Sequence, residues 1–251
     1  MDSQKHFSPV VTEEPEVKGF STNVKVNESG DDNIQDLSSI LDPLDEIRIL
    51  QHLDFIEVCL GWERNNRYSI YNKQGEQILY VYEAAPCVSR QCYGSLRALS
   101  LIITDNDDRR LLYLQRPLRC STRCFYACCC LQELDIYRSR ENKVGAVLES
   151  WNCCIPEYQL SDSSDSLKFY LTGTCTHFRC CCSINFTVKS TSGYEVASIC
   201  KKWSGLKEII GACNEFKITY FDGLTKEDKI LILGAAFLLD FNYFERHGKC
   251  F

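Results

Sequence analysis

Apolar and polar residues alternate along several stretches of the chain with a period of two residues. In SINFTVKS, the side chains of Ile184, Phe186 and Val188 share one face, and the run Phe216–Tyr220 repeats the pattern. This period is typical of a β-strand that buries one face, and aromatic and β-branched residues suit such positions. The chain is therefore predicted to be mainly β.

Turn signals pair these stretches into hairpins. Three segments each contain two strand-like runs around a short turn: Arg67–Ala84 around Asn72–Gly75, Arg97–Pro117 around Asp105–Asp108, and Ser183–Trp203 around Thr191–Gly193. Short strands joined by turns at this spacing predict an antiparallel sandwich or barrel. The acidic cluster Asp105–Asp108 is explained by its turn, because aspartates hydrogen-bond readily to their own backbone there.

The start of the chain lacks any such period. Residues 1–40 are polar and poor in aromatic residues, so we expect a disordered tail there and a folded domain over 41–251. Asp42 followed by Pro43 resembles a helix start. The apolar residues Ile47, Ile49 and Leu50 fit either a short helix or an entering strand, and the pattern does not separate the two.

The segment Thr225–Glu245 breaks the strand pattern near the end of the chain. Thr225 and Asp228 form a capping pair, and the run that follows is apolar on every side, which is typical of a helix inside a protein or a membrane. The uncharged run between Lys229 and Asp240 is about half of the roughly 20 residues that a bilayer span needs. A carboxylate at Asp240 would add about 2.5–3.5 kcal/mol to insertion. We therefore expect a helix buried within the sheet, with a membrane span as the alternative, through Ile230, Leu231, Ile232, Leu233, Phe237, Leu238 and Leu239.

Composition and charge narrow the functional classes. The net charge is -6 and the sequence pI about 5.4, which makes nucleic-acid binding an unfavoured role, since such domains usually carry a basic surplus. The polar, acidic beginning of the chain shows no secretory signal, so we expect a cytosolic environment. In that environment the 17 cysteines are not expected to form a disulfide framework.

The cysteines cluster, most densely in CFYACCC. Neighbouring cysteines on an extended chain point to opposite sides, and no second pair has zinc-finger spacing. His177, near Cys175 and Cys180–Cys182, offers a weak candidate for a cysteine-based enzyme. Isolated cysteines such as Cys59 and Cys200 suit small buried hydrophobic positions.

For the dense cluster CFYACCC we favour S-acylation, because two or more acyl chains anchor a protein stably where one does not. The candidates are Cys124, Cys128, Cys129 and Cys130.

Several motifs in order resemble the phospholipid scramblases. They are NNRYSIYNKQGEQILYVYE (Asn65–Glu83), RPLRC…CCCLQELDI (Arg116–Ile136), KKWSGL (Lys201–Leu206) and ILGAAFLLDFNYFE (Ile232–Glu245). The resemblance covers about Leu41 to Glu245 and implies a tubby-like fold, a closed antiparallel barrel around a hydrophobic helix. It further implies calcium-stimulated, bidirectional movement of phospholipids at the cytoplasmic face of the plasma membrane, palmitate on the four cysteines, and no covalent chemistry. The partners implied are the phospholipid membrane and, as an open question, further copies of the chain.

The sequence departs from the family pattern at two places. Members of the family often begin with a long proline-rich region, but only Pro9 and Pro15 precede residue 40 here, so SH3- or WW-type partners are not favoured. The family's calcium loop maps to Ala212–Gly223, where Lys217 stands at the glycine position of an EF-hand loop. Only Asn214, Glu215 and Asp222 could bind calcium there, and we expect weak affinity.

A small basic stretch, Cys200–Lys207, surrounds Trp203. The matching region of the family is linked to nuclear import, whereas a solvated strand end explains the charges more simply. Basic residues beside a tryptophan would also suit contact with an anionic leaflet.

Three functions remain under consideration from the sequence: a membrane-anchored lipid scramblase, a tethered interaction module without scrambling activity, and a cysteine-based enzyme.

Overall fold

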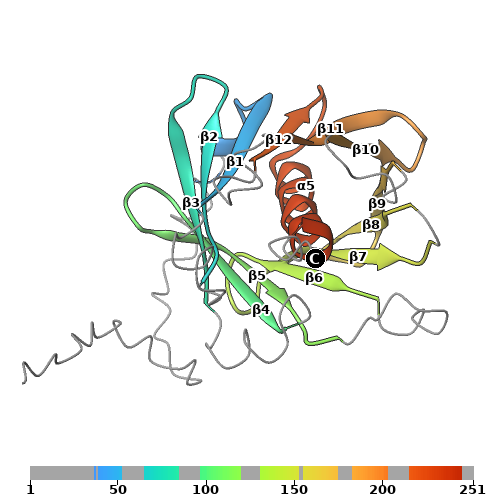
Figure 1. Cartoon of the computed structure of the whole chain (residues 1–251), viewed down its shortest axis with the longest axis horizontal. Helices are drawn as coiled ribbons and strands as arrows, with labels where there is room; N and C mark the ends of the chain where they lie inside the picture. The colour runs from blue at the N-terminus through green and yellow to red at the C-terminus, as the bar shows by residue number, and fades with distance from the viewer. Residues whose placement is uncertain are drawn as a thin grey trace, which may run out of the picture.

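Twelve antiparallel strands close into a barrel in the computed structural model of the chain (Figure 1). The structure describes residue 37 and residues 39–52, 65–84, 97–119, 131–152, 155–174, 183–202 and 215–244. The strands are β1 (Glu46–His52), β2 (Arg67–Asn72), β3 (Gln77–Glu83), β4 (Leu99–Thr104), β5 (Arg110–Arg116), β6 (Glu133–Tyr137), β7 (Lys143–Ser150), β8 (Glu157–Asp162), β9 (Leu167–Gly173), β10 (Ile184–Ser190), β11 (Glu195–Lys202) and β12 (Glu215–Tyr220).

Each strand pairs with the next one along the chain, and β1 pairs with β12 to close the barrel. In that closing pair Ile47 lies opposite Ile218, and Ile49 lies opposite Phe216. All four side chains are buried, as the alternation in the sequence predicts for residues that face the interior. The prediction of a closed antiparallel barrel is confirmed, and the three predicted hairpins lie at β2–β3, β4–β5 and β10–β11.

The up-and-down order gives the barrel two unlike ends. Short hairpin turns at residues 73–76, 105–109, 138–142, 163–166 and 191–194 all lie at one end, which we call the turn end. The connections 53–66, 84–98, 117–132, 151–156, 174–183 and 203–214 all leave from the opposite end, which we call the connection end. This follows from geometry, because successive antiparallel strands run in opposite directions.

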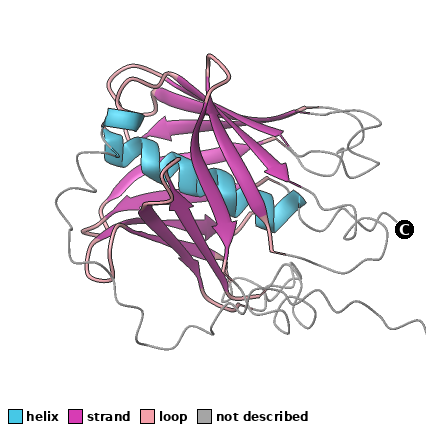
Figure 2. Cartoon of the chain, turned by 90° about the vertical axis from the view of Figure 1, so that its left-hand side faces the viewer, coloured by secondary structure: helices cyan, strands magenta, loops and turns pink. Residues whose placement is uncertain are grey.

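A helix fills the barrel. Helix α5 (Lys226–Leu239) begins at the turn end and continues as a π-helical turn, η4 (Asp240–Phe244), toward the connection end (Figure 2). Its start is capped as predicted, since Thr225 and Asp228 form a reciprocal capping box. The apolar residues predicted to be buried are at most 1% exposed: Ile230, Leu231, Ile232, Leu233, Phe237, Leu238 and Leu239. The helix is therefore part of the core.

Within the described residues, no helix has the length and apolar character that crossing a membrane requires. Helix α5 itself has 14 residues, and those from Asp228 to Leu239 are all buried. A helix that is apolar all round needs such a surrounding layer when it lies inside a protein.

Two glycines allow the helix to approach the wall closely. A Cβ atom at Gly145 on β7 would meet the backbone oxygen of Ser161 and come within 2.7 Å of Leu231 Cδ2. A Cβ atom at Gly234 on α5 would meet Ile136 Cδ1. At Gly145 the nearest atom is a backbone oxygen, which cannot move aside as the end of a side chain can. Any residue larger than glycine at this position would therefore displace β8 or the helix.

The N-terminal residues of the domain also pack on the core. Leu37 and Leu41 are 1% exposed and belong to the hydrophobic core. The ammonium group of Lys229 donates hydrogen bonds to the carbonyl oxygens of Leu41, Asp42 and Leu44, at 2.8 to 3.0 Å. A charged group on the central helix thereby holds this segment over the turn end.

The prediction of a helix start at Asp42 and Pro43 is wrong. Residues 39–41 are helical, and Asp42 and Pro43 form the turn that follows them. The chain then enters β1, so Ile47, Ile49 and Leu50 belong to a strand. The carbonyl oxygens of Leu41, Asp42 and Leu44 accept hydrogen bonds from Lys229, whereas in a continuing helix they would accept them from later backbone amides.

We predict that Gly145→Ala lowers the free energy of unfolding by about 1–3 kcal/mol, because the added methyl group overpacks the contact between β8 and α5. Urea unfolding of the purified chain measures this. Ser192→Ala, in the exposed turn between β10 and β11, is the matched control and should leave the midpoint unchanged. Equal midpoints for Gly145→Ala and the unmodified chain would contradict the packing described above.

Candidate functional site

Most cysteines of the chain belong to the connections attached to the connection end. Fifteen of the 17 cysteines belong to connections that leave and re-enter the barrel at this end: Cys59, Cys87, Cys92, Cys120, Cys124, Cys128–Cys130, Cys153, Cys154, Cys175, Cys180–Cys182 and Cys213. Of the other two, Cys200 lies on β11 and Cys250 follows the helix. The cysteine-bearing connections are thus all attached to one end of the barrel.

The connection with the densest cysteine cluster has a fixed stem. Arg119 donates a hydrogen bond to the carbonyl oxygen of Leu131 (2.7 Å) and forms an ion pair with Glu133 (2.7 Å). Gln132 donates from its side chain to the carbonyl oxygen of Arg119 (2.9 Å), and its backbone N–H donates to Glu149 (3.0 Å). These bonds hold the two ends of the connection together and tie them to β7.

The predicted acylation sites Cys124, Cys128, Cys129 and Cys130 lie outside the described residues, as do Cys175, His177 and Cys180–Cys182 of the cysteine-enzyme hypothesis. Cys200 is described, and burial raises the pKa of its thiol, although nearby Lys202 and Lys217 act to lower it. A raised pKa reduces the thiolate fraction at neutral pH, so Cys200 is not set up as a nucleophile.

Buried polar groups fix the end of the helix at the connection end. Tyr68 of β2 donates a hydrogen bond to Asp240 (2.8 Å), and its ring packs edge-on against Phe237. Asn242 donates to the hydroxyl of Tyr158 (2.9 Å) and accepts a bond from Arg116 (3.3 Å). The carboxylate that would penalise membrane insertion therefore has a partner inside the barrel.

A buried ion pair adjoins this network. Glu83 and Arg97 are in contact at 2.7 Å and have side chains 0% and 1% exposed. Asn66 also donates to Glu83, at 2.9 Å. The guanidinium groups of Arg97 and Arg116 lie 5.6 and 5.4 Å from the centre of the Phe241 ring. Removing one partner of such a pair would leave a buried charge uncompensated, so these groups are suited to hold the helix end in place.

The two described calcium candidates lie far apart. Glu215 is the first residue of β12, and Asp222 comes two residues after its end, so the length of the strand, about 17 Å, separates them. Glu215 forms an ion pair with Lys202 at 2.6 Å. Because a calcium ion binds its oxygen ligands at about 2.3–2.6 Å, Glu215 and Asp222 cannot bind the same ion. Asn214 lies outside the described residues.

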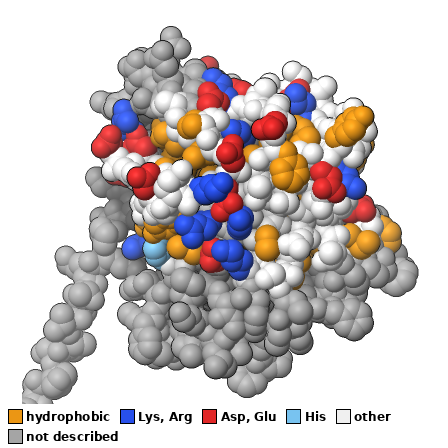
Figure 3. Space-filling model, turned by 90° about the horizontal axis from the view of Figure 1, so that it is seen from above, with side chains coloured by type: hydrophobic (Ala, Val, Ile, Leu, Met, Phe, Trp, Pro, Cys, Tyr) orange, Lys and Arg blue, Asp and Glu red, His pale blue; other side chains and the backbone are white. Residues whose placement is uncertain are grey.

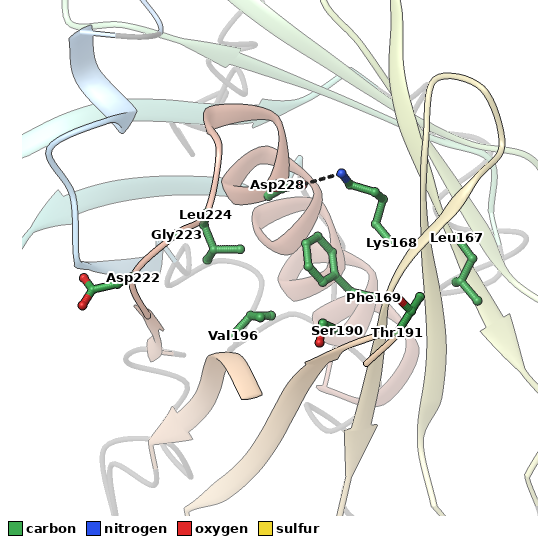
Figure 4. Close-up of a pocket in the computed structure, with 10 residues that line it drawn as sticks. All are labelled: Leu167, Lys168, Phe169, Ser190, Thr191, Val196, Asp222, Gly223, Leu224 and Asp228. Carbon is green, nitrogen blue, oxygen red and sulfur yellow. Dashed lines mark ion pairs between the residues drawn. The ribbon is translucent and has the colours of Figure 1, made fainter. Parts of the chain in front are cut away.

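Asp222 lies beside a pocket of about 320 Å³ at the turn end, next to the start of α5. Figure 4 shows Lys168 reaching toward Asp228, at 3.8 Å, while the Asp222 carboxylate points away from them. Asp228 also accepts bonds from the backbone and hydroxyl of Thr225 in the helix cap. Among the residues that the structure describes, no group of three or more His, Cys, Asp or Glu side chains could hold a metal ion.

The basic stretch after Cys200 has two environments. Lys201 is buried, with its ammonium group 4.7 Å from the centre of the Phe244 ring, so the strand end is only partly solvated. Lys202 and Lys217 on the outer face pair with Glu215 and Glu46. Figure 3 looks onto the wall that contains β1 and β12, and basic and acidic side chains alternate there. Residues 203–207, including Trp203, lie outside the described part of the chain.

Sequence reasoning missed the stem around Arg119 and Gln132. It also missed the buried groups Glu83, Arg97 and Lys201. From sequence alone, a charged or polar residue is expected to be exposed to solvent unless a buried partner for it is known. Each of these residues has its partner more than ten positions away in the sequence. Glu83 carried one signal, because it occupies an inward-facing position in the alternation of β3.

Comparison with known proteins agrees with this architecture. The family model described as Scramblase matches residues 28–246. The chain is 37% identical over 211 residues to phospholipid scramblase 1 of Rattus norvegicus, which covers 83% of this chain and 62% of that protein. It is 37% identical over 207 residues to phospholipid scramblase 2 of Bos taurus, covering 82% and 70%. It is 32% identical over 207 residues to phospholipid scramblase family member 5 of Homo sapiens, covering 82% and 76%.

The chain thus spans somewhat less than two thirds of the rat relative. The matched region includes every described strand, the central helix and the stem of the cysteine-bearing connection. With a family model over most of its length and relatives above 30% identity, the chain belongs to the scramblase family.

Proposed function

We propose that this protein moves phospholipids in both directions between the leaflets of the plasma membrane, from its cytoplasmic face, with stimulation by calcium. The observation that carries the proposal is membership of the scramblase family across the whole barrel and its helix. The proteins of similar sequence are named phospholipid scramblases, and a membrane is therefore the partner that this chain is expected to meet.

The route of the lipid head group is constrained by the filled barrel. A polar head group needs a polar path through the hydrocarbon region, because burying unpaired polar groups costs several kcal/mol. In the described residues, α5 occupies the barrel interior and is buried throughout its apolar run. We therefore infer that any lipid movement takes place along the outer surface of the protein, or between copies of it, rather than through the barrel.

The same observation supports a second candidate function. A lipid-anchored barrel without a lumen could act as an interaction module that has no scrambling activity of its own. The two candidates share the membrane anchor and differ in whether the purified chain accelerates lipid exchange between leaflets.

The anchor is proposed to be palmitate on Cys124, Cys128, Cys129 and Cys130. The stem of their connection supports this, because Arg119 and Gln132 fix the two ends of the segment at the connection end. Four acyl chains at one place would hold the protein stably, whereas a single chain gives only marginal binding.

We predict that the purified chain, reconstituted in liposomes, accelerates the exchange of fluorescently labelled phospholipid between leaflets. Dithionite, which bleaches only label in the outer leaflet, measures the rate. A rate equal to that of protein-free liposomes, both with and without calcium, would favour the interaction module instead.

Replacing Cys124 and Cys128–Cys130 by serine is expected to move the protein from the membrane fraction to the soluble fraction of cells, because the acyl chains would be lost. Fractionation followed by immunoblotting measures the shift, and hydroxylamine, which cleaves thioesters, should reproduce it. Cys200→Ser, on β11, is the control that should leave the distribution unchanged. Membrane retention of the fourfold variant would contradict this anchor.

Calcium affinity should be weak, because Glu215 and Asp222 lie at opposite ends of β12 and cannot complete one coordination shell. Isothermal titration calorimetry of the purified chain should show no micromolar binding. Micromolar binding that disappears in Asp222→Ala, and persists in the paired control Asp165→Ala, would overturn this expectation.

A further inference from the structure

Large apolar side chains are exposed unevenly around the barrel. Four of those on the described surface lie at or close to the connection-end termini of β5, β7 and β8: Leu118 (44% exposed), Leu148 (38%), Trp151 (55%) and Ile155 (37%). We call these four residues the apolar rim patch. They lie just after β5, near the end of β7, and in the connection from β7 to β8.

The patch is a compact feature of the fold. Strands β5, β6, β7 and β8 are consecutive neighbours in the barrel, so the patch is about 15 Å wide at the usual strand spacing. Leu148 lies opposite Glu133 on β6 and Gln159 on β8. The backbone N–H of Ile155 donates to the side chain of Asn152 at 3.1 Å, which ties Ile155 to the residue after Trp151.

The patch adjoins the stem of the cysteine-bearing connection. Leu118 directly precedes Arg119, whose side chain pairs with Glu133. Glu149, the residue after Leu148, is hydrogen-bonded to the backbone of Gln132. The segment that carries Cys124 and Cys128–Cys130 therefore leaves the barrel and returns to it within the patch.

The charges at the two ends of the barrel differ in a way that favours a membrane partner. The hairpin turns of the turn end carry clustered carboxylates, with Asp105, Asp107 and Asp108 in one turn and Asp162 and Asp165 around another. Arg109 pairs with Asp105 and Asp107, and Lys143 pairs with Asp165, which leaves the two turns with a smaller net negative charge that an anionic leaflet repels. The apolar rim patch lies at the other end, and tryptophan, its most exposed member, favours the boundary between lipid head groups and acyl chains.

We propose that the apolar rim patch enters the head-group region of a phospholipid bilayer and orients the barrel with its connection end against the membrane. This inference rests on the proposed membrane function and adds the surface that makes the contact. The patch is a binding surface separate from the acyl chains, so it operates when the four cysteines are unmodified. The other two tryptophans, Trp62 and Trp203, belong to connections that leave from the same end.

Vesicle binding of the full chain tests the proposal. The chain carries serine at Cys124 and Cys128–Cys130, which excludes the acyl anchor, and the vesicles contain phosphatidylcholine and phosphatidylserine in equal parts. Flotation gives the partition coefficient, which we expect to fall about tenfold or more in the double variant Trp151→Ser/Ile155→Ser, because two apolar side chains no longer leave water. The matched control, Tyr194→Ser/Phe221→Ser, changes two exposed aromatic residues near the turn end and should bind like the parent.

A fluorescence measurement locates the patch in the bilayer. Lipids with bromine on the acyl chains should quench part of the tryptophan emission of the parent. Trp151→Phe, which keeps an aromatic side chain, should retain binding and lose the part of the quenching that Trp151 contributes, leaving at most the part from Trp62 and Trp203. Unchanged far-ultraviolet circular dichroism and cooperative unfolding in urea will show that each variant is folded.

Several results would overturn the proposal. It fails if the parent does not bind the vesicles, if the rim variant binds as well as the parent, or if the turn-end control loses as much binding. It also fails if the rim variant changes only the oligomeric state, measured by light scattering, since the patch would then be a contact between copies. Lipid exchange between the leaflets is measured separately in the same vesicles. If binding depends on the patch but no exchange is seen, the proposed scrambling activity is refuted and the proposed membrane-contact surface still stands.

Discussion

The barrel depends on the burial of one helix that has no polar face. Twelve strands that curve into a closed sheet enclose a space, and the inward-facing side chains do not fill it alone. Helix α5 does so, and residues from Ile230 to Leu239 are at most 1% exposed where they are apolar. The close contacts at Gly145 and Gly234 show how little room is left. Since hydrophobic burial is the dominant favourable term in folding, barrel and helix are mutually dependent parts of one core.

Polar groups at both ends of the helix set its position along the barrel axis. At the turn end, Lys229 donates to three backbone carbonyl oxygens of the entering chain, and burial raises the pKa of Tyr220 beside it. At the connection end, Tyr68 and Tyr158 bond to Asp240 and Asn242. Apolar contacts are non-directional and would tolerate sliding, whereas these hydrogen bonds are satisfied in one position.

The sequence predicted features that depend on neighbouring residues, and it missed those that depend on residues far apart along the chain. The period of two at Phe216–Tyr220 and the apolar run of α5 are local signals, and both predictions were confirmed. Asp42 and Pro43 misled because a lysine 187 positions away binds the carbonyl oxygen of Asp42. The attachment of the cysteine-bearing connections to one end follows only when every strand is counted, and the predicted strands did not include β6 to β9. The acylation sites stay predictions because Cys124 and Cys128–Cys130 lie outside the described residues. Weak calcium binding also stays a prediction, because it concerns a ligand and because Asn214 lies outside the described residues.

The energetics of the buried helix explain why membrane contact has to come from elsewhere on the protein. Hydrocarbon tails are about as apolar as the side chains of a barrel interior, so moving α5 from the barrel into lipid would gain little transfer free energy. The move would expose the barrel lining to water, at about 25 cal/mol for each Å² uncovered, and would break the bonds of Lys229 and Asp240. A helix that is already surrounded by apolar side chains therefore has no thermodynamic reason to leave them. Groups that face water in the folded barrel, namely its exposed apolar side chains and any acylated thiols, are the ones that gain by entering a bilayer.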